Sequence, residues 1–330
     1  VLGSVLRAQR TLASDFPLGD GGMFYAMARQ LQANHLAMPM LLDYNQAGIP
    51  FAYPPLAFYA TALLSNLTGA NLLDILRLLP LAAACLILPA VWLLARAMLA
   101  SRWAAAAAVC ALAIVPRGFL SLVVGGGLTR APGLLFAILA LRELHLLLVA
   151  QRARRHLILA TILCGLTLLT HTQTASVLAI SAGVFVLAFG RDKHAVLSAC
   201  LVAVGALLVA APWWLVVLLH FGPAPLLAAL NSGGGGLPLA TLVDGAAWRT
   251  AFIWAQDGEP IPLAGILGLI GAIFALRRKE WTLPAWWLLV VVLVPRAGAT
   301  YATVPLALLA GSAAVTIVRA TFAVQRRRLL

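Results

Sequence analysis

Long apolar blocks separated by short polar stretches dominate the hydropathy pattern of this 330-residue chain. A straight helix needs about 20 residues to cross a bilayer, and several blocks approach or exceed that length. The apolar residues fill each block instead of following one amphipathic face, which is typical of membrane helices. The pattern predicts an all-α polytopic helical bundle with about nine spans. They run over roughly residues 78–95, 103–116, 131–150, 157–170, 177–190, 195–219, 262–276, 281–295 and 302–318.

Two shorter helices are predicted in the polar N-terminal segment. Residues 22–36 carry apolar side chains on one face, and residues 53–67 start with Pro54-Pro55, which suits a helix N-terminus. If the second helix crossed the membrane, every basic loop after it would change sides. Both helices are therefore predicted to lie along the membrane surface. Because the chain starts at Val1 without Met or a basic leader, we read no signal peptide and expect a preceding native span.

These elements divide the chain into four predicted parts. An N-terminal outer loop with two surface helices covers residues 1–77, and transmembrane spans cover residues 78–219. A glycine-rich outer loop covers residues 220–261, and C-terminal spans cover residues 262–330. The run of glycines at 233–236 predicts a mobile stretch in the third part, because glycine is costly to order.

Composition excludes a soluble globular protein. The mean hydropathy is +0.99, 63% of the residues are hydrophobic and only 10% are charged. A net charge of +13 invites a nucleic-acid partner, but the basic residues cluster at the ends of apolar blocks instead of lining one face. No nucleic-acid partner is therefore expected. The four cysteines fall inside apolar blocks without the spacing of a metal site or a disulfide.

The loops between the spans alternate in charge, which predicts their sides. Cytoplasmic loops of membrane proteins are rich in Lys and Arg, so the basic set is expected in the cytoplasm and the other set outside. The basic set holds Arg96, Arg102, Arg152, Arg154, Arg155, Arg191, Lys193, Arg277, Arg278, Lys279, Arg326, Arg327 and Arg328. The other set holds seven of the ten acids, namely Asp15, Asp20, Asp43, Asp74, Asp244, Asp257 and Glu259.

The first outer loop is the best candidate for an active site. It combines acids at Asp15 and Asp20 with the element Tyr53-Pro-Pro-Leu-Ala-Phe-Tyr59. A carboxylate-bearing loop set on a bundle of spans suits an enzyme that works on a lipid-linked substrate. Asp20 lies in Gly19-Asp20-Gly21, which is also good turn chemistry, so a structural role for it stays open.

The same loop, with Arg77-Leu-Leu-Pro80, Gly125-Gly-Gly-Leu-Thr-Arg130 and Leu169-Thr-His171, resembles the GT-C superfamily of polytopic membrane glycosyltransferases. That superfamily includes protein O-mannosyltransferases and lipid A aminoarabinose transferases. The resemblance implies an inverting hexosyl- or pentosyltransferase of the bacterial plasma membrane. It would move a sugar from a polyprenyl-phosphate donor to a glycan, lipid or protein acceptor on the extracytoplasmic face.

The resemblance also implies roles for particular residues. A loop carboxylate acts as general base in the family, which points to Asp20 first and Asp15 second. A divalent metal sometimes lies nearby, so the metal requirement is left open, and no other cofactor is expected. Many relatives carry a second acid in the next outer loop, whereas residues 116–130 contain none. That departure weakens a two-carboxylate or metal assignment.

Several outer residues are candidates for binding the donor. Four arginines lie on the side that the charge rule says should avoid them, so they either bind a lipid phosphate or snorkel as structural cations. His171 either binds substrate, ligates a metal or is a hydrogen-bonded structural histidine. The candidates are Arg117, Arg130, Arg249, Arg296, Tyr53, His171 and Tyr301.

Two rival functions remain open. A transporter or flippase of a lipid-linked substrate would show paired broken spans or charges at mid-depth, whereas the charges here cluster at span ends. A non-catalytic relative with the same fold is the second rival, because the second-loop acid is missing.

The predicted topology can be tested with single cysteines at Gly19 and Gln151. We expect a membrane-impermeant thiol reagent to label Gly19→Cys from outside intact cells and Gln151→Cys only after permeabilisation. Labelling of both positions from the same side would contradict the loop assignment.

Overall fold

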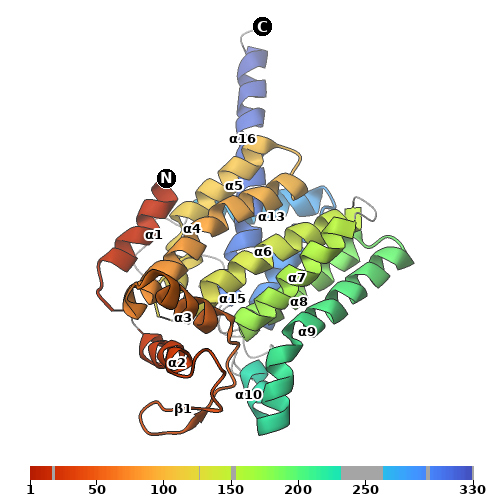
Figure 1. The fold of residues 1–330 in the computed structure, drawn as a ribbon. Coiled ribbons are helices and arrows are strands. Elements are labelled where there is room, and N and C mark those ends of the chain that lie inside the picture. The colour runs from red at the N-terminus through yellow and green to blue at the C-terminus, as the bar shows by residue number, and fades with distance from the viewer. Residues whose placement is uncertain (17–18, 126, 150–153, 232–262, 295–297, 329–330) are drawn as a thin grey trace.

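The computed structural model describes residues 1–16, 19–125, 127–149, 154–231, 263–294 and 298–328. They form a bundle of long helices with a cap of shorter elements at one end (Figure 1). Each predicted apolar block forms a helix, which confirms the all-α fold class. The long helices are α4 (Leu72–Met98), α5 (Arg102–Ile114), α6 (Gly127–Val149), α7 (Arg154–Thr170), α8 (Thr172–Phe189), α9 (Lys193–Phe221), α13 (Leu263–Arg277), α14 (Thr282–Leu293) and α16 (Thr303–Arg328).

Five described helices are long and apolar enough to cross a membrane, namely α4, α6, α8, α9 and the first 21 residues of α16. A sixth span results if α5 and residues 116–122, which meet at a bend of 91°, are counted together. Helices α13 and α14 are apolar but shorter. The chain is therefore an integral membrane protein, while the count of nine spans stays a prediction.

The N-terminal segment forms the cap. Helices are present at both predicted positions, and an antiparallel hairpin lies between them. That these helices lie on the membrane surface stays a prediction. The sequence analysis missed a third helix, which precedes them. The cap consists of α2 (Gly21–Ala33), β1 (Leu41–Leu42), β2 (Ile49–Pro50) and α3 (Leu56–Thr68), whereas the preceding α1 (Leu2–Leu12) lies along α4 and α5 at the side of the bundle (Figure 1).

An aromatic cluster holds the cap together. Phe24 of α2 packs edge-on against Phe58 of α3 with 5.1 Å between ring centroids, and Phe51 lies 6.3 Å from Phe58. All three side chains are buried, in a core that is separate from that of the spans. Burying large aromatic rings stabilises the cap strongly. The stretch between β2 and α3 is therefore fixed in place.

The Arg7 side chain connects helix α1 to the spans through hydrogen bonds and a cation–π contact. This side chain is fully buried, and Nη1 donates to the carbonyl oxygen of Gly3 at 2.8 Å and to that of Ala113 at 3.2 Å. The guanidinium lies 4.5 Å from the Phe119 ring centroid, within the range of a cation–π interaction. A cation at the C-terminal end of α5 also complements the helix dipole.

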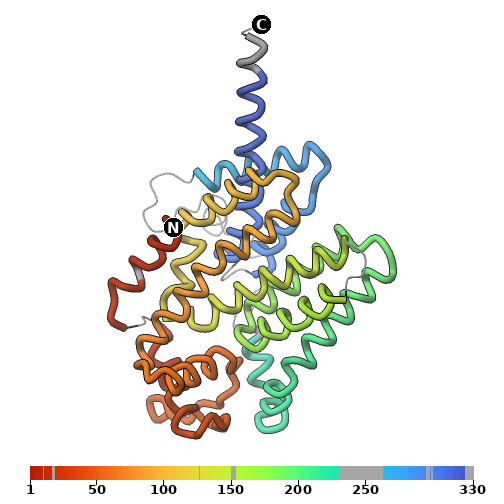
Figure 2. The backbone as a smooth tube through the Cα atoms, turned by 45° about the horizontal axis from the view of Figure 1, so that its top comes forward, coloured from red at the N-terminus to blue at the C-terminus, as the bar shows by residue number. Residues whose placement is uncertain are grey.

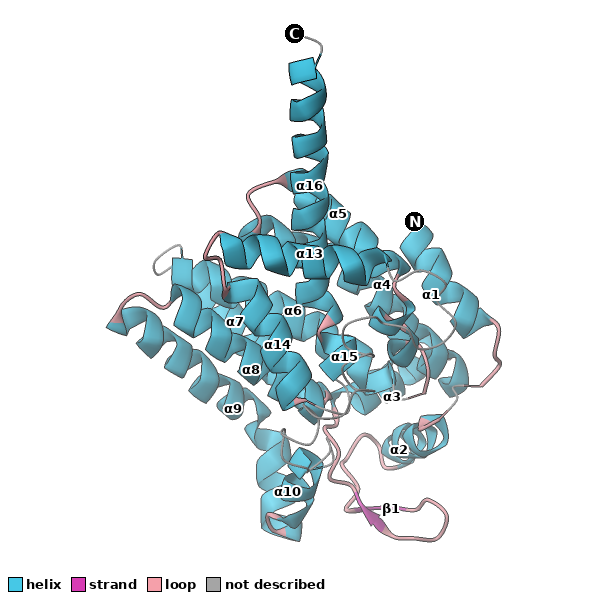
Figure 3. Cartoon of the chain, turned by 180° about the vertical axis from the view of Figure 1, so that it is seen from behind, coloured by secondary structure: helices cyan, strands magenta, loops and turns pink. Residues whose placement is uncertain are grey.

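Close helix crossings in the bundle depend on glycine. A Cβ at Gly311 of α16 would lie 2.2 Å from the carbonyl oxygen of Ala104 in α5. A Cβ at Gly271 of α13 would lie 2.1 Å from the carbonyl oxygen of Leu309 in α16. Glycine therefore permits these backbone approaches, as small residues commonly do between membrane helices. Helix α16 runs through the middle of this assembly (Figure 3).

A buried charge cluster joins α6 to α7. His156 Nδ1 donates to Glu143 Oε2 at 2.6 Å, and Arg142 forms an ion pair with the other oxygen of the same carboxylate. Glu143 and His156 are 4% and 5% exposed. A buried carboxylate is tolerated when it is paired in this way. The cluster holds the two helices together near the connection that joins them.

Where the structure describes them, the two sets of loops lie at opposite ends of the bundle. The C-terminal ends of α4, α6, α8 and α13, which precede the basic connections, lie away from the cap (Figures 1 and 2). The cap end gathers η1 (Pro116–Gly118), η2 (Leu120–Leu122), α10 (Ala224–Asn231) and α15 (Gly298–Tyr301). Helix α10 occupies the start of the predicted glycine-rich loop. The remainder of that loop lies outside the described residues.

Gly311 provides a test of the bundle packing. We expect Gly311→Ala to lower the melting temperature in detergent by roughly 5 °C or more, because overpacking a tight crossing costs about 1–3 kcal/mol. Gly183 of α8 is the matched control, since a Cβ there would meet no atom within 4 Å. Gly183→Ala should leave the melting temperature unchanged or raise it. Equal effects of the two substitutions would contradict the packing argument.

Candidate functional site

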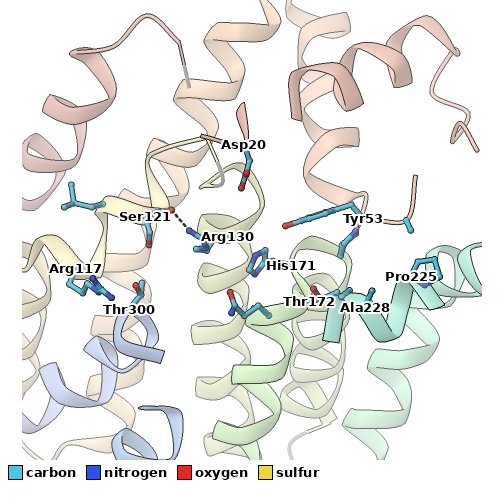
Figure 4. Close-up of a pocket in the computed structure, with 15 residues that line it drawn as sticks. Asp20, Tyr53, Arg117, Ser121, Arg130, His171, Thr172, Pro225, Ala228 and Thr300 are labelled. Carbon is cyan, nitrogen blue, oxygen red and sulfur yellow. Dashed lines mark hydrogen bonds between the residues drawn. The ribbon is translucent and has the colours of Figure 1, made fainter. Parts of the chain in front are cut away.

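A cavity of about 710 Å³ opens at the cap end of the bundle (Figure 4). Pockets for small molecules usually measure roughly 300–1,000 Å³, so it is large enough for a sugar phosphate group. Its walls come from the cap, both 3₁₀ turns, α6, α8, α10 and α15. The lining residues are Asp20, Ala52, Tyr53, Pro54, Arg117, Leu120, Ser121, Arg130, His171, Thr172, Gln173, Pro225, Ala228, Ala229 and Thr300.

Asp20 reaches the cavity from the start of α2. Gly19 before it has a φ of +77°, a conformation that glycine adopts without strain, so the chain can turn here. Asp20 is the N-cap residue of α2, yet its side chain makes no capping hydrogen bond. The exposed carboxylate is therefore available to a ligand in the cavity.

Two arginines lie on the cavity wall. Arg117 belongs to η1, where the chain bends sharply after α5, and Arg130 belongs to the start of α6. Arg130 Nη1 donates to the carbonyl oxygen of Ser121 at 3.1 Å, which fixes the guanidinium against η2. Together with Asp20, the described lining carries two cations and one carboxylate. Its net positive charge favours an anionic ligand.

Tyr53 projects into the cavity from the stretch before α3. The aromatic cluster orients it, with its ring centroid 5.5 Å from that of Phe24. Its hydroxyl lies 3.3 Å from Thr129 Oγ1. Burial raises the pKa of Tyr53, so the phenol stays protonated at neutral pH. It can donate a hydrogen bond to a bound ligand.

His171 lies between α7 and α8 and caps the N-terminus of α8. Its Nδ1 accepts from the backbone N–H of Thr174 at 3.1 Å and lies 2.8 Å from Thr174 Oγ1. Burial, with a further contribution from Arg130, lowers the pKa of His171, so the ring is neutral. His171 is therefore a hydrogen-bonded helix cap, which is the structural role considered for it from the sequence. Its Nδ1 is used by the cap, so Nε2 is the ring nitrogen that remains to face the cavity.

No three His, Cys, Asp or Glu side chains come together as a metal site would require, within the ranges that the structure describes. The described residues therefore offer no set of metal ligands, and whether the protein needs a metal stays open.

The other candidates lie elsewhere. Tyr301 is 2% exposed and is not a lining residue; it lies behind the wall, where its hydroxyl is 2.8 Å from Thr174 Oγ1. The predicted contact of Tyr301 with substrate therefore stays a prediction. Asp15 is exposed between α1 and α2 and does not line the cavity. Arg249 and Arg296 lie outside the described residues.

Sequence analysis missed several lining residues. Ser121 and Thr300 bring polar groups near the two arginines, and α10 contributes an apolar wall through Pro225, Ala228 and Ala229. The three α10 positions share one helical face, a spacing visible in the sequence. No helix was predicted there, because the segment was read as part of a loop.

Comparison with known families identifies the chain. The sequence profile described as dolichyl-phosphate-mannose-protein mannosyltransferase matches residues 52–216, half of the chain. The chain belongs to this family. The result confirms the predicted resemblance to GT-C membrane glycosyltransferases. The matched region includes Tyr53, Arg117, Arg130 and His171, whereas Asp20 precedes it. Comparison with curated protein sequences gives no significant match.

Solved structures share the fold of this mannosyltransferase-family chain. The archaeal oligosaccharyltransferase AglB from Archaeoglobus fulgidus, in complex with an inhibitory peptide and a dolichol-phosphate, is similar at a TM-score of 0.63 and 17% identity, over 94% of this chain and 48% of AglB. ArnT from Cupriavidus metallidurans, bound to undecaprenyl phosphate, is similar at 0.59 and 18%, over 94% of this chain and 59% of ArnT. The chain thus spans between about half and three fifths of these proteins.

Proposed function

We propose that this chain is an inverting glycosyltransferase that moves a hexose or pentose from a polyprenyl-phosphate donor to an acceptor hydroxyl. The acceptor would belong to a glycan, a lipid or a protein. The observation that carries the proposal is that Asp20, Arg117, Arg130 and His171 line one cavity at the bundle end. A base and an anion-binding group are the two features that such a transfer needs close together.

The proposed chemistry assigns a task to each side chain. The acceptor oxygen attacks the anomeric carbon, the bond from that carbon to the phosphate oxygen breaks, and the polyprenyl phosphate leaves. Asp20 accepts the proton of the acceptor hydroxyl and later releases it to water. Arg117 and Arg130 stabilise the charge that grows on the leaving phosphate, for which guanidinium groups are well suited. A single displacement inverts the anomeric configuration.

Two comparisons support a lipid-linked donor. The AglB structure holds a dolichol-phosphate, and the ArnT structure holds undecaprenyl phosphate, so lipid phosphates bind proteins of this fold. The positively charged lining described above offers matching chemistry in this chain. We propose that the donor phosphate meets Arg117 and Arg130 while the acceptor approaches Asp20.

Loop charge supports the side on which the reaction would take place. The basic connections lie at the end of the bundle opposite the cavity, and basic loops face the cytoplasm in membrane proteins. We therefore propose an extracytoplasmic cavity in a bacterial plasma membrane.

Removing the charge of Asp20 tests the proposed base. In proteoliposomes supplied with a panel of polyprenyl-phosphate sugars and acceptors, we expect Asp20→Asn to slow sugar transfer by about 100-fold or more, because the proton acceptor is lost. Asp43→Asn is the control, since Asp43 is exposed on the hairpin segment and does not line the cavity.

The outcomes separate the rival readings. Unchanged transfer by Asp20→Asn would exclude Asp20 as the base, and a loss with Asp15→Asn alone would move that role to the second candidate. Absence of transfer by the wild type with every donor, despite retained lipid-phosphate binding, would favour a transporter or a non-catalytic relative.

Arg130 tests the proposed phosphate site separately from catalysis. We expect Arg130→Gln to weaken binding of undecaprenyl phosphate by about tenfold or more, because a hydrogen bond to a charged group is worth about 1.5–3 kcal/mol. Binding can be measured by titration of the purified protein in nanodiscs. Arg102→Gln, at the opposite end of the bundle, should bind like the wild type. Equal weakening in both variants would argue against a phosphate site at Arg130.

A further inference from the structure

A chain of buried polar groups runs behind the cavity wall. Tyr301 of α15 contacts Thr174 of α8 across 127 positions of sequence, with 2.8 Å between the two hydroxyl oxygens. Thr174 Oγ1 in turn lies 2.8 Å from His171 Nδ1. Thr174 and Tyr301 are 0% and 2% exposed, and His171 is 6% exposed. Three polar side chains are thus aligned between the centre of the bundle and the cavity.

The direction of the hydrogen bonds follows from the helix cap. His171 Nδ1 accepts the backbone N–H of Thr174 at 3.1 Å, so this nitrogen carries no proton. The Thr174 hydroxyl must then donate to Nδ1 and not accept from it. Its oxygen is left to accept from Tyr301, whose phenol is therefore the donor. In the neutral ring the proton lies on Nε2, the nitrogen that faces the cavity.

The protonation states of both end groups agree with this direction. Burial raises the pKa of Tyr301 to about 12, against the smaller lowering effects of the Thr174 hydrogen bond and of the nearby Arg130 guanidinium. Tyr301 therefore keeps its proton at neutral pH. Burial lowers the pKa of His171, which keeps the ring neutral.

The side chains of His171, Thr174 and Tyr301 are tightly packed and have little room to move. A Cβ at Gly133 of α6 would lie 3.2 Å from His171 Cβ and 3.5 Å from Thr174 Oγ1. Helix α6 therefore packs closely against both residues. A void of only about 20 Å³ borders Thr174 and Tyr301, and most of its other lining residues are apolar, such as Leu134, Ile138 and Val304. A hydroxyl that lost its partner here would find few replacements.

The geometry points to Tyr301 and Thr174 as positioning residues that hold His171 as a neutral Nε2–H donor to the phosphate of a lipid-linked ligand. The Thr174 hydroxyl and backbone N–H share the lone pair of Nδ1, and together they polarise the imidazole and strengthen the donor on its opposite side. The inference rests on the proposed function for the identity of the ligand. The tautomer and its dependence on Tyr301 follow from this chain's own contacts.

Nitrogen NMR of the 330-residue chain tests the inference without any activity assay. The chain contains six histidines, so the His171 signals in ¹⁵N-histidine-labelled protein can be identified by their loss in His171→Gln. We expect wild-type His171 to be neutral with its proton on Nε2. Titration with undecaprenyl phosphate in nanodiscs should shift the Nε2 signal.

Substitutions of Tyr301 and Thr174 should change both the His171 NMR signals and the affinity for undecaprenyl phosphate. We expect Tyr301→Phe and Thr174→Val to shift the Nδ1 signal and to raise the dissociation constant for undecaprenyl phosphate by about three- to tenfold, the worth of roughly one hydrogen bond. Thr174→Ser keeps the hydroxyl and should restore both properties. Tyr59→Phe, which removes a phenol from α3 away from the cavity, is the matched control.

The outcomes distinguish the inference from the proposed function. A proton on Nδ1 in the wild type, or signals and affinity that Tyr301→Phe leaves unchanged, would overturn the inference even if sugar transfer is observed. Undecaprenyl phosphate that binds without affecting His171 Nε2 would do the same. If the wild type shows the expected tautomer but neither binds the lipid nor transfers sugar, the proposed function and the role assigned to His171 both fail.

Discussion

Backbone polar groups cannot be left unpaired in hydrocarbon, and this constraint determines the plan of the molecule. Each lipid-embedded segment must satisfy its own N–H and C=O groups, so apolar blocks form helices. Consecutive spans then return the chain to alternate ends of the bundle. Every second connection therefore lies at the same end of the bundle. This brings η1, the His171 turn and α15 together although they are far apart in sequence. The cavity forms where these connections meet.

Close packing converts this arrangement into a rigid site. Glycines at the α5–α16 and α13–α16 crossings allow backbones to approach more closely than larger side chains permit. The Glu143–His156 cluster joins α6 and α7 near the end that carries the basic connections. Arg130 and His171 lie at the other end of these two helices. A displacement between α6 and α7 would therefore change the distance between the two groups.

The cavity brings one carboxylate and two guanidinium groups to a common space. Asp20 arrives with the cap, whereas Arg117 and Arg130 arrive with the bundle, and the aromatic cluster around Phe58 holds the cap in position. The cap and the bundle support these groups separately, so a carboxylate and two guanidinium groups face one space, as the proposed transfer requires. The neutral His171 adds a donor without adding charge.

The amino-acid sequence by itself determined the class of the fold and named the charged residues that line the cavity. Hydropathy and loop charge depend on composition over many residues, so the apolar helices and the two surface helices could be predicted. Asp20, Arg117, Arg130, Tyr53 and His171 could be named because polar groups in outer loops of a membrane protein are few. Only the tertiary structure decided how they meet, that α1 and α10 are helices, and that Tyr301 stands behind the wall instead of on it. Its contact with Thr174 joins residues 127 positions apart. Such a contact depends on how helices pack against each other, which local sequence patterns do not encode.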